Sequence, residues 1–356
     1  ALQTTMDPEE LETMLAAGTR SIEAWELYLQ AQDTLSSRHH GSHTGLGDDV
    51  LDLLQQAVAI DPAFADAHIG IAGIYNSHFR RSSMMKLAGV ASNAEARELF
   101  GEAISAASAH ARSEAARLEY QALLADAEVR YDDLLAISKQ WAALQPEESD
   151  ALIQLMAAQL FAGDYAGSAN SALRAADLFR DEGHSLAATY QYLHRVDVDA
   201  ALSMVQEELR KTAVRGSDLY QAHRVLLYAG DIEGAAQLVP QLLRTMDDEG
   251  SNYMVKIRQA CAEGRVADAD ALYQQAAETE MRQSNDWLFL KTLGFDDRAR
   301  LSLLPFDNPD DFYELGSFMS YTTFDPNDFP YFASRLAEQG VSRPPAHKIP
   351  FACKRD

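Results

Sequence analysis

The sequence has few of the features that mark an enzyme, a metal protein or a membrane protein. It contains no G-x-S-x-G, H-E-x-x-H or C-x-x-C motif and no phosphate-binding loop with its lysine. We therefore predict a protein that is not an enzyme and uses no cofactor. No apolar run approaches the roughly eighteen residues that a membrane span needs.

Basic residues are also scarce. The chain has 30 Lys and Arg residues against 54 Asp and Glu residues, and its formal net charge is -24. This charge repels nucleic-acid phosphates and anionic lipid surfaces, and no run of basic residues forms a local patch that could reverse it. We expect no direct binding to nucleic acid and none to membranes.

Cysteine is nearly absent. Cys261 and Cys353 lie far apart and match no zinc or redox spacing, so they leave the compartment open. The sequence favours two free thiols. A disulfide between them, which would draw the C-terminal segment across the inner face of the molecule, is the less favoured alternative.

A period of about 34 residues runs through most of the chain. Three stretches, at 160–176, 228–243 and 261–277, each carry a glycine, a short polar turn and a helix with small residues on one face. The matching small or apolar positions are spaced 34, 33, 34 and 34 residues apart: Leu134, Ser168, Ala201, Ala235 and Ala269.

This period, with a glycine between two helices and a proline or polar turn after the second, resembles the tetratricopeptide repeat (TPR). In that pattern Ala57 allows two helices to approach closely, and Pro62 ends the second helix. The resemblance implies an all-α, right-handed α-solenoid of about seven to eight TPR-like helix pairs. The last pair is shortened and ends near Leu304.

The C-terminal segment breaks the period. Seven of the eleven prolines fall within residues 305–356, a density that a regular helix array does not tolerate. The same segment is rich in Phe and Tyr. We predict a cap that covers the last repeat, with one short helix at 331–340 that Gly340 stops. The predicted organisation is an N-terminal helix at 1–20, a repeat array at 21–304 and a cap with an extended tail at 305–356.

Both ends of the chain resemble parts of bacterial multidomain regulators. Residues 1–32, beginning "ALQTTMDPEEL", look like the junction at which a TolB-like segment passes into TPR repeats, and "YELGSFMSYTTFDPNDFPYFASRLAEQG" looks like the C-terminal cap of such proteins. The upstream module in that family is a CadC-like winged-helix regulator or a class III adenylate cyclase. The resemblance implies a regulatory region that follows the remnant of a preceding domain. The region would be periplasmic in a membrane-anchored regulator and cytoplasmic beside a cyclase.

One loop has the composition of a metal site. His39, His40 and His43 supply three imidazoles in the segment "RHHGSH", but a solvated inserted loop explains them more simply, and we predict no metal.

The first helices of successive TPR units line a concave groove. Extending that geometry to this chain predicts a partner-binding face in which Arg224 and Arg258, one period apart, present two guanidinium groups suited to a carboxylate or an acidic peptide. Pairing with local acidic residues is the simpler alternative. The predicted residues of this face are Tyr190, Tyr220, Arg224, Tyr228, Met254 and Arg258.

The sequence thus predicts a protein-interaction and regulatory module of a larger bacterial signalling protein. Its partner would be a protein or peptide, or an attached effector domain. Two other functions remain open: the sensing of a small ligand and an oligomerisation scaffold. The sequence does not determine the oligomeric state.

Overall fold

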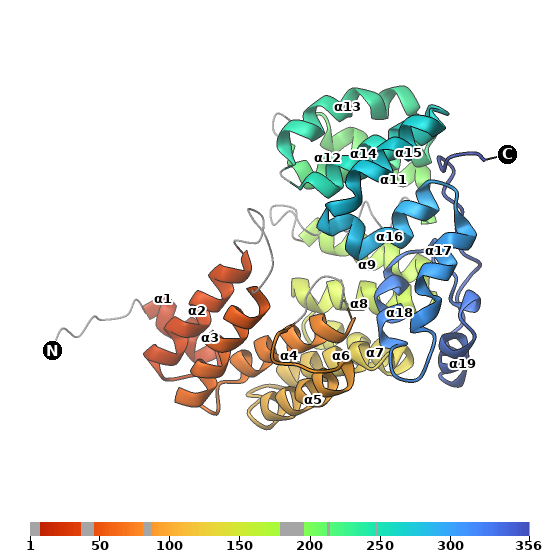
Figure 1. Cartoon of the computed structure of the whole chain (residues 1–356). Helices are drawn as coiled ribbons and strands as arrows, with labels where there is room; N and C mark the ends of the chain where they lie inside the picture. The colour runs from red at the N-terminus through yellow and green to blue at the C-terminus, as the bar shows by residue number, and fades with distance from the viewer. Residues whose placement is uncertain are drawn as a thin grey trace. The chain divides into compact units, whose positions relative to one another are not determined.

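A computed structural model describes residues 8–36, 46–80, 87–178, 196–211, 214–246 and 248–355 (Figure 1). Within these ranges every regular element is a helix, as the sequence predicts, and no helix there is both long and apolar enough to cross a membrane. The chain divides into two compact units, Ala1–Val129 and Arg130–Asp356.

In the first unit, helices that follow one another in sequence pack side by side, with α2 on α3, α3 on α4 and α4 on α5. The described helices of this unit are α1 (Pro8–Ala17), α2 (Ile22–Ser36), α3 (Leu46–Ile60), α4 (Ala65–Arg80), α5 (Asn93–Ala109) and α6 (Glu114–Ala127).

Local sequence explains where these helices begin and end. Helix α3 ends at Ile60, directly before Asp61 and Pro62, because proline lacks the N–H that a further helical turn requires. Helix α5 begins after Ser92, whose hydroxyl accepts a hydrogen bond from the backbone N–H of Glu95. Ala57 is fully buried, as expected of a position where two helices approach closely.

The second unit continues the helix pairs and ends in the cap. The helices pack side by side in consecutive pairs: α8 with α9, α12 with α13, α14 with α15, and α16 with α17. The described helices are α7 (Tyr131–Leu144), α8 (Ser149–Phe161), α9 (Tyr165–Leu178), α11 (Val198–Glu208), α12 (Gly216–Tyr228), α13 (Ile232–Thr245), α14 (Glu249–Ala262), α15 (Val266–Gln275), α16 (Glu280–Thr292), α17 (Asp296–Leu303), α18 (Tyr313–Gly316) and α19 (Pro330–Glu338).

The 34-residue period has a structural counterpart in a buried position that recurs along the helices of the second unit. Each small or apolar position used to set the repeat frame lies on a helix and is at most 1% exposed. Small side chains there let neighbouring helices pack closely, because interiors leave little free volume. These positions are Leu134 in α7, Ser168 in α9, Ala201 in α11, Ala235 in α13 and Ala269 in α15.

The glycines between paired helices have a left-handed backbone. Gly163, Gly230 and Gly264 have φ values of 83°, 80° and 74°, a backbone conformation that residues other than glycine rarely adopt. The residue after Gly230 is Asp231, which caps α13 by accepting a hydrogen bond from the N–H of Gly234. The glycine and the polar turn predicted from the repeat are therefore both confirmed.

The cap buries the face of the last pair. The Trp287 ring on α16 lies 5.4 Å from the Phe318 ring, 5.7 Å from that of Tyr321 and 5.9 Å from that of Phe324, measured between centroids.

The predicted short helix is α19, and Gly340 follows it with φ of 71°. The segment holds more helix than predicted, because three prolines stand in the first turn of short helices, where a missing N–H costs nothing. They are Pro305, Pro326 and Pro330.

The cap also contacts the first helices of its own unit (Figure 1). The Tyr131 hydroxyl at the start of α7 donates a hydrogen bond to the carbonyl of Gly316, and the Tyr131 N–H donates one to the side chain of Gln339. Within this unit the cap therefore joins α7 to α16, whereas the sequence predicted only that it covers the last repeat. The boundaries predicted at residues 20 and 304 remain predictions.

Candidate partner-binding face

The predicted face falls on two neighbouring helices of the second unit, α12 and α14. Tyr220, Arg224 and Tyr228 lie one turn apart along α12, and Met254 and Arg258 lie one turn apart along α14. Tyr190 lies outside the described residues. The partner-binding role of these residues remains a prediction, and the structure shows how their side chains lie.

Arg258 and Tyr220 are in direct contact. The guanidinium carbon of Arg258 lies 4.7 Å from the centroid of the Tyr220 ring, which places a cation over an aromatic face. Arg258 is only 2% exposed, yet its Nη1 has no hydrogen-bond acceptor. No carboxylate among the described residues pairs with it, so the local ion pair that the sequence offered as the simpler explanation is missing there.

The other predicted residues differ from Arg258 in their surroundings. Arg224 is 6% exposed, and its Nη2 donates a hydrogen bond of 2.6 Å to the side chain of Gln221. Met254 is fully buried, and its sulfur lies 3.9 Å from the Thr292 hydroxyl on α16. The structure thus brings Tyr220 and Arg258 together at one point of the face, while Met254 belongs to the packing between helices.

Tyr228 packs against the C-terminal tail. Its ring lies 5.2 Å from the ring of Phe351 in an edge-to-face arrangement. Phe351 is buried in a cluster with Leu226 and Leu227 of α12 and Ala235 of α13. The chain itself therefore covers the Tyr228 end of the predicted face.

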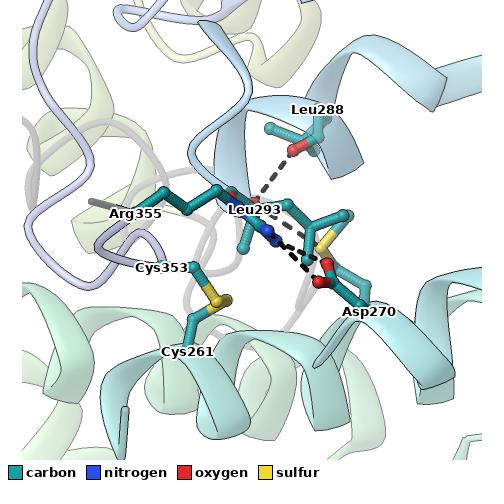
Figure 2. The surroundings of a disulfide bond; sticks show 8 residues. Cys261, Asp270, Leu288, Leu293, Cys353 and Arg355 are labelled. Carbon is teal, nitrogen blue, oxygen red and sulfur yellow. Dashed lines mark hydrogen bonds and ion pairs between the residues drawn. A yellow bond between two sulfur atoms is a disulfide. The ribbon is translucent and has the colours of Figure 1, made fainter. Parts of the chain in front are cut away.

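A disulfide fastens this tail (Figure 2). Cys261 at the end of α14 is bonded to Cys353. The prediction of two free thiols, which the sequence favoured, is therefore wrong. Beside the bond, Arg355 donates to both carboxylate oxygens of Asp270 and to the carbonyl of Leu293. The tail is thus held both covalently and by a charged pair.

The tail follows the turns between paired helices. Farther back along it, Arg343 donates to the hydroxyl of Tyr165 at 2.9 Å, where α9 begins. The backbone of the tail comes so close to Gly163 and Gly294 that a side chain at either glycine would collide with it. We name residues 341–355 the strap. They contact α9, α12, α14, α15 and α16.

His223 and Gln259 lie on the same two helices, although the face predicted from the sequence does not include them. Both are buried, and the Nε2 of His223 lies 3.1 Å from the Oε1 of Gln259. Gln259 donates its amide hydrogens to Ile232 and Glu263, so its oxygen accepts and His223 Nε2 carries the proton. His223 Nδ1 is then an acceptor, and it has no partner. The spacing of three from Tyr220 on α12 was the signal that could have revealed His223.

Burial, with a smaller contribution from the charge of Arg258, lowers the pKa of His223 to about 3. A histidine held neutral in the folded state stabilises the fold above its unfolded pKa of about 6.5 and opposes folding below it.

This histidine predicts a pH dependence of stability. Between pH 7 and pH 5 the native chain should lose about 2 kcal/mol of unfolding free energy that the His223→Gln variant does not lose, because only the unfolded native chain gains that proton. Urea unfolding of both chains at the two pH values gives this difference, with other acid-sensitive groups cancelling. Equal losses in the two chains would contradict the assignment.

The three histidines of the candidate metal loop lie outside the described residues. In the ranges that the structure does describe, no group of three or more His, Cys, Asp and Glu side chains is arranged to hold a metal ion.

No protein-family model and no curated protein matches the chain. Similar proteins are found among the solved structures. A tetratricopeptide repeat protein from Parabacteroides merdae ATCC 43184 is 11% identical with a TM-score of 0.49, covering 78% of this chain and 100% of that one. Naa15/Naa10 bound to HypK-THB is 14% identical with a TM-score of 0.33, covering 89% and 47%. The P58(IPK) TPR domain is 12% identical with a TM-score of 0.28, covering 90% and 99%.

The chain contains a TPR-like repeat region. Three features of the chain define this region: paired helices, a buried small or apolar position that recurs about every 34 residues, and glycines with positive φ between the paired helices.

Proposed function

We propose that this chain is a non-catalytic protein-interaction module that binds a protein segment or a neighbouring domain through the face formed by α12 and α14. Arrays of helix pairs suit this role because each pair contacts only its neighbours and leaves an extended surface for a partner. The single observation that carries the proposal is Arg258, a buried guanidinium that stacks on Tyr220 and whose Nη1 has no acceptor.

The proposed context is a regulatory region of a larger bacterial signalling protein. The support is the resemblance of the two end segments to TolB-like and TPR regulators. The Cys261–Cys353 disulfide adds a second argument, because such bonds persist mainly in oxidising compartments. Of the two layouts, it favours the membrane-anchored regulator with this region in the periplasm.

Site-specific photo-crosslinking tests the interaction. With p-benzoylphenylalanine in place of Tyr220, which is half-buried beside Arg258, irradiation in the native host should yield an adduct with one defined protein. The matched control carries the same group in place of Leu301, an exposed residue of α17, and should not give that adduct.

The outcomes separate the candidate functions. An adduct with one other protein, found only from position 220, supports the interaction module. An adduct between two copies of the chain would favour the oligomerisation scaffold. The absence of any adduct specific to position 220 would contradict the proposal.

A further inference from the structure

A group of polar side chains in the first unit gathers at the start of α4. Asp66 lies in the first turn of this helix, directly after Phe64 and Ala65. The ring of Tyr28 on α2 lies 5.1 Å from the Phe64 ring, and Tyr120 on α6 is buried in one cluster with Ala65. Tyrosines from two other helices therefore pack beside the residues that precede Asp66.

The three side chains lie within electrostatic reach of one another. Burial raises the pKa of Tyr28 and that of Tyr120, and in both residues the charge of Asp66 is the next cause. Burial also raises the pKa of Asp66, to about 6. A carboxylate charge held at this place has therefore lost part of its hydration.

Two of these groups have no hydrogen-bond partner among the described residues. Tyr120 is 3% exposed, and its hydroxyl is unpaired, although buried polar groups are normally hydrogen-bonded. The carboxylate of Asp66 is also unpaired, but it is not enclosed, because Asp66 is half-buried and its oxygens stay open to solvent. A ligand can therefore reach the carboxylate without any opening of the fold.

The nearest described cation does not neutralise Asp66 by direct pairing. The charge of Arg112 lowers the pKa of Asp66, but this effect is smaller than that of burial. The guanidinium of Arg112 donates instead to the carbonyls of Leu15 and Gly18, at the end of α1. The hydrogen-bonding capacity of the Asp66 carboxylate is thus available to a ligand.

We infer that Asp66, together with Tyr28 and Tyr120, binds the guanidinium group of an arginine from a basic segment of a partner protein. The two oxygens of a carboxylate accept parallel hydrogen bonds from the planar guanidinium fork, and such bonds are stronger than neutral ones. An aromatic ring attracts a cation over its face, and the Tyr120 hydroxyl supplies a further acceptor. The arginine replaces hydrogen bonds that burial has taken from the carboxylate.

The charge of the whole chain favours the same kind of partner. A formal net charge of -24 attracts basic proteins and repels acidic ones. The site lies on α2, α4 and α6 of the first unit, and so goes beyond the proposed face on α12 and α14. It shares with the proposed function only the requirement that the partner is a protein.

The test uses the full chain and acetylated, amidated tripeptides of the form Gly-X-Gly, in which X is arginine, lysine or citrulline. Citrulline keeps the shape of arginine but carries no charge. Binding is followed by the backbone amide signals of Asp66 and Tyr120 in proton–nitrogen NMR spectra. We expect saturable shifts with the arginine peptide, weaker binding of the lysine peptide and no shift with the citrulline peptide.

Three results of this titration would overturn the inference. They are equal shifts with arginine and citrulline, binding of lysine as tight as that of arginine, and no saturable shift with arginine up to about 10 mM. In the last case ordered water is the occupant of the site.

Two variants connect the response to the site. Asp66→Asn keeps the shape of the side chain and removes its charge, so we expect a folded chain without the arginine response. Tyr120→Phe removes the unpaired hydroxyl alone and should weaken binding roughly two- to tenfold, the range for one hydrogen bond. The matched control, Asp52→Asn, removes an exposed carboxylate on α3 and should bind as the native chain does. An undiminished response in Asp66→Asn would overturn the inference.

The native chain gives a further test that needs no variant. Arginine binds the ionised form of Asp66, which falls from about nine-tenths at pH 7 to about one-tenth at pH 5 for a pKa of about 6. The dissociation constant should therefore rise about tenfold between these pH values. Tyr28 and Tyr120 keep their protons throughout, and the other charged groups around the site are Arg112 and Glu119. Equal affinity at both pH values would contradict the role of Asp66.

The arginine site and the proposed function can fail separately. A crosslinked partner at position 220, with no arginine response in the native chain, would remove the site and leave the interaction module. A saturable arginine response that is lost in Asp66→Asn, without any captured protein, would keep the carboxylate site and contradict the module.

Discussion

Reduction of the Cys261–Cys353 disulfide should strongly destabilise the second unit. The bond closes a loop with a sequence separation of 92, and a loop of this length restricts the unfolded chain by about 4 to 5 kcal/mol on the chain-entropy estimate. The strap should be released at the same time. Phe351 would then leave its cluster with Leu226 and Leu227, and Arg355 would separate from Asp270.

Urea unfolding with and without a dithiol reductant measures this effect, and hydrogen exchange reports the strap. We expect the midpoint to fall and the amides of the strap to lose protection. The control is the Cys261→Ser, Cys353→Ser double variant, which should match the reduced chain and be insensitive to the reductant. An unchanged midpoint after verified reduction would show that the strap holds without its disulfide.

Replacement of Trp287 by Ala should have an effect of similar size. Trp287 is 4% exposed and contacts three aromatic rings of the cap, so its removal leaves a large cavity between α16 and the cap. Large-to-small changes of a buried aromatic residue typically cost about 3 to 5 kcal/mol. Because the cap also contacts α7 through Tyr131, the loss should reach the start of the unit as well as its end.

Chemical unfolding of Trp287→Ala, followed by circular dichroism, measures the loss. The matched control is Leu301→Ala on α17, where the native side chain is 53% exposed and the expected change lies within about 0.5 kcal/mol. A Trp287→Ala chain as stable as the control would mean that the aromatic cluster contributes little to the stability of the cap.

The sequence predicted the repeat because close helix packing constrains the residue type at each turn of the period. Positions 235 and 269 hold alanine because neighbouring helices leave little room there. Gly230 and Gly264 have positive φ, a backbone conformation that residues with a side chain disfavour. Such constraints act over a few residues and recur in every unit. They are therefore visible in a single sequence as a spacing.

The candidate site was predicted only in outline. The period placed Arg224 and Arg258 at equivalent positions, but it carried no information on how far each would be buried or what each would contact. Arg224 reaches a glutamine on its own helix, whereas Arg258 reaches a tyrosine on the neighbouring helix. That difference depends on side-chain packing between α12 and α14, which differs from one repeat to the next.

The sequence by itself determined the fold class, the helix pairs and the presence of a cap, because each follows from local spacing and from residues that end helices. Only the tertiary structure decided that Cys261 pairs with Cys353, that the strap covers Tyr228 and that the cap returns to α7. These contacts join residues far apart in sequence. Their geometry depends on how the helices stack, and no spacing along the chain encodes it.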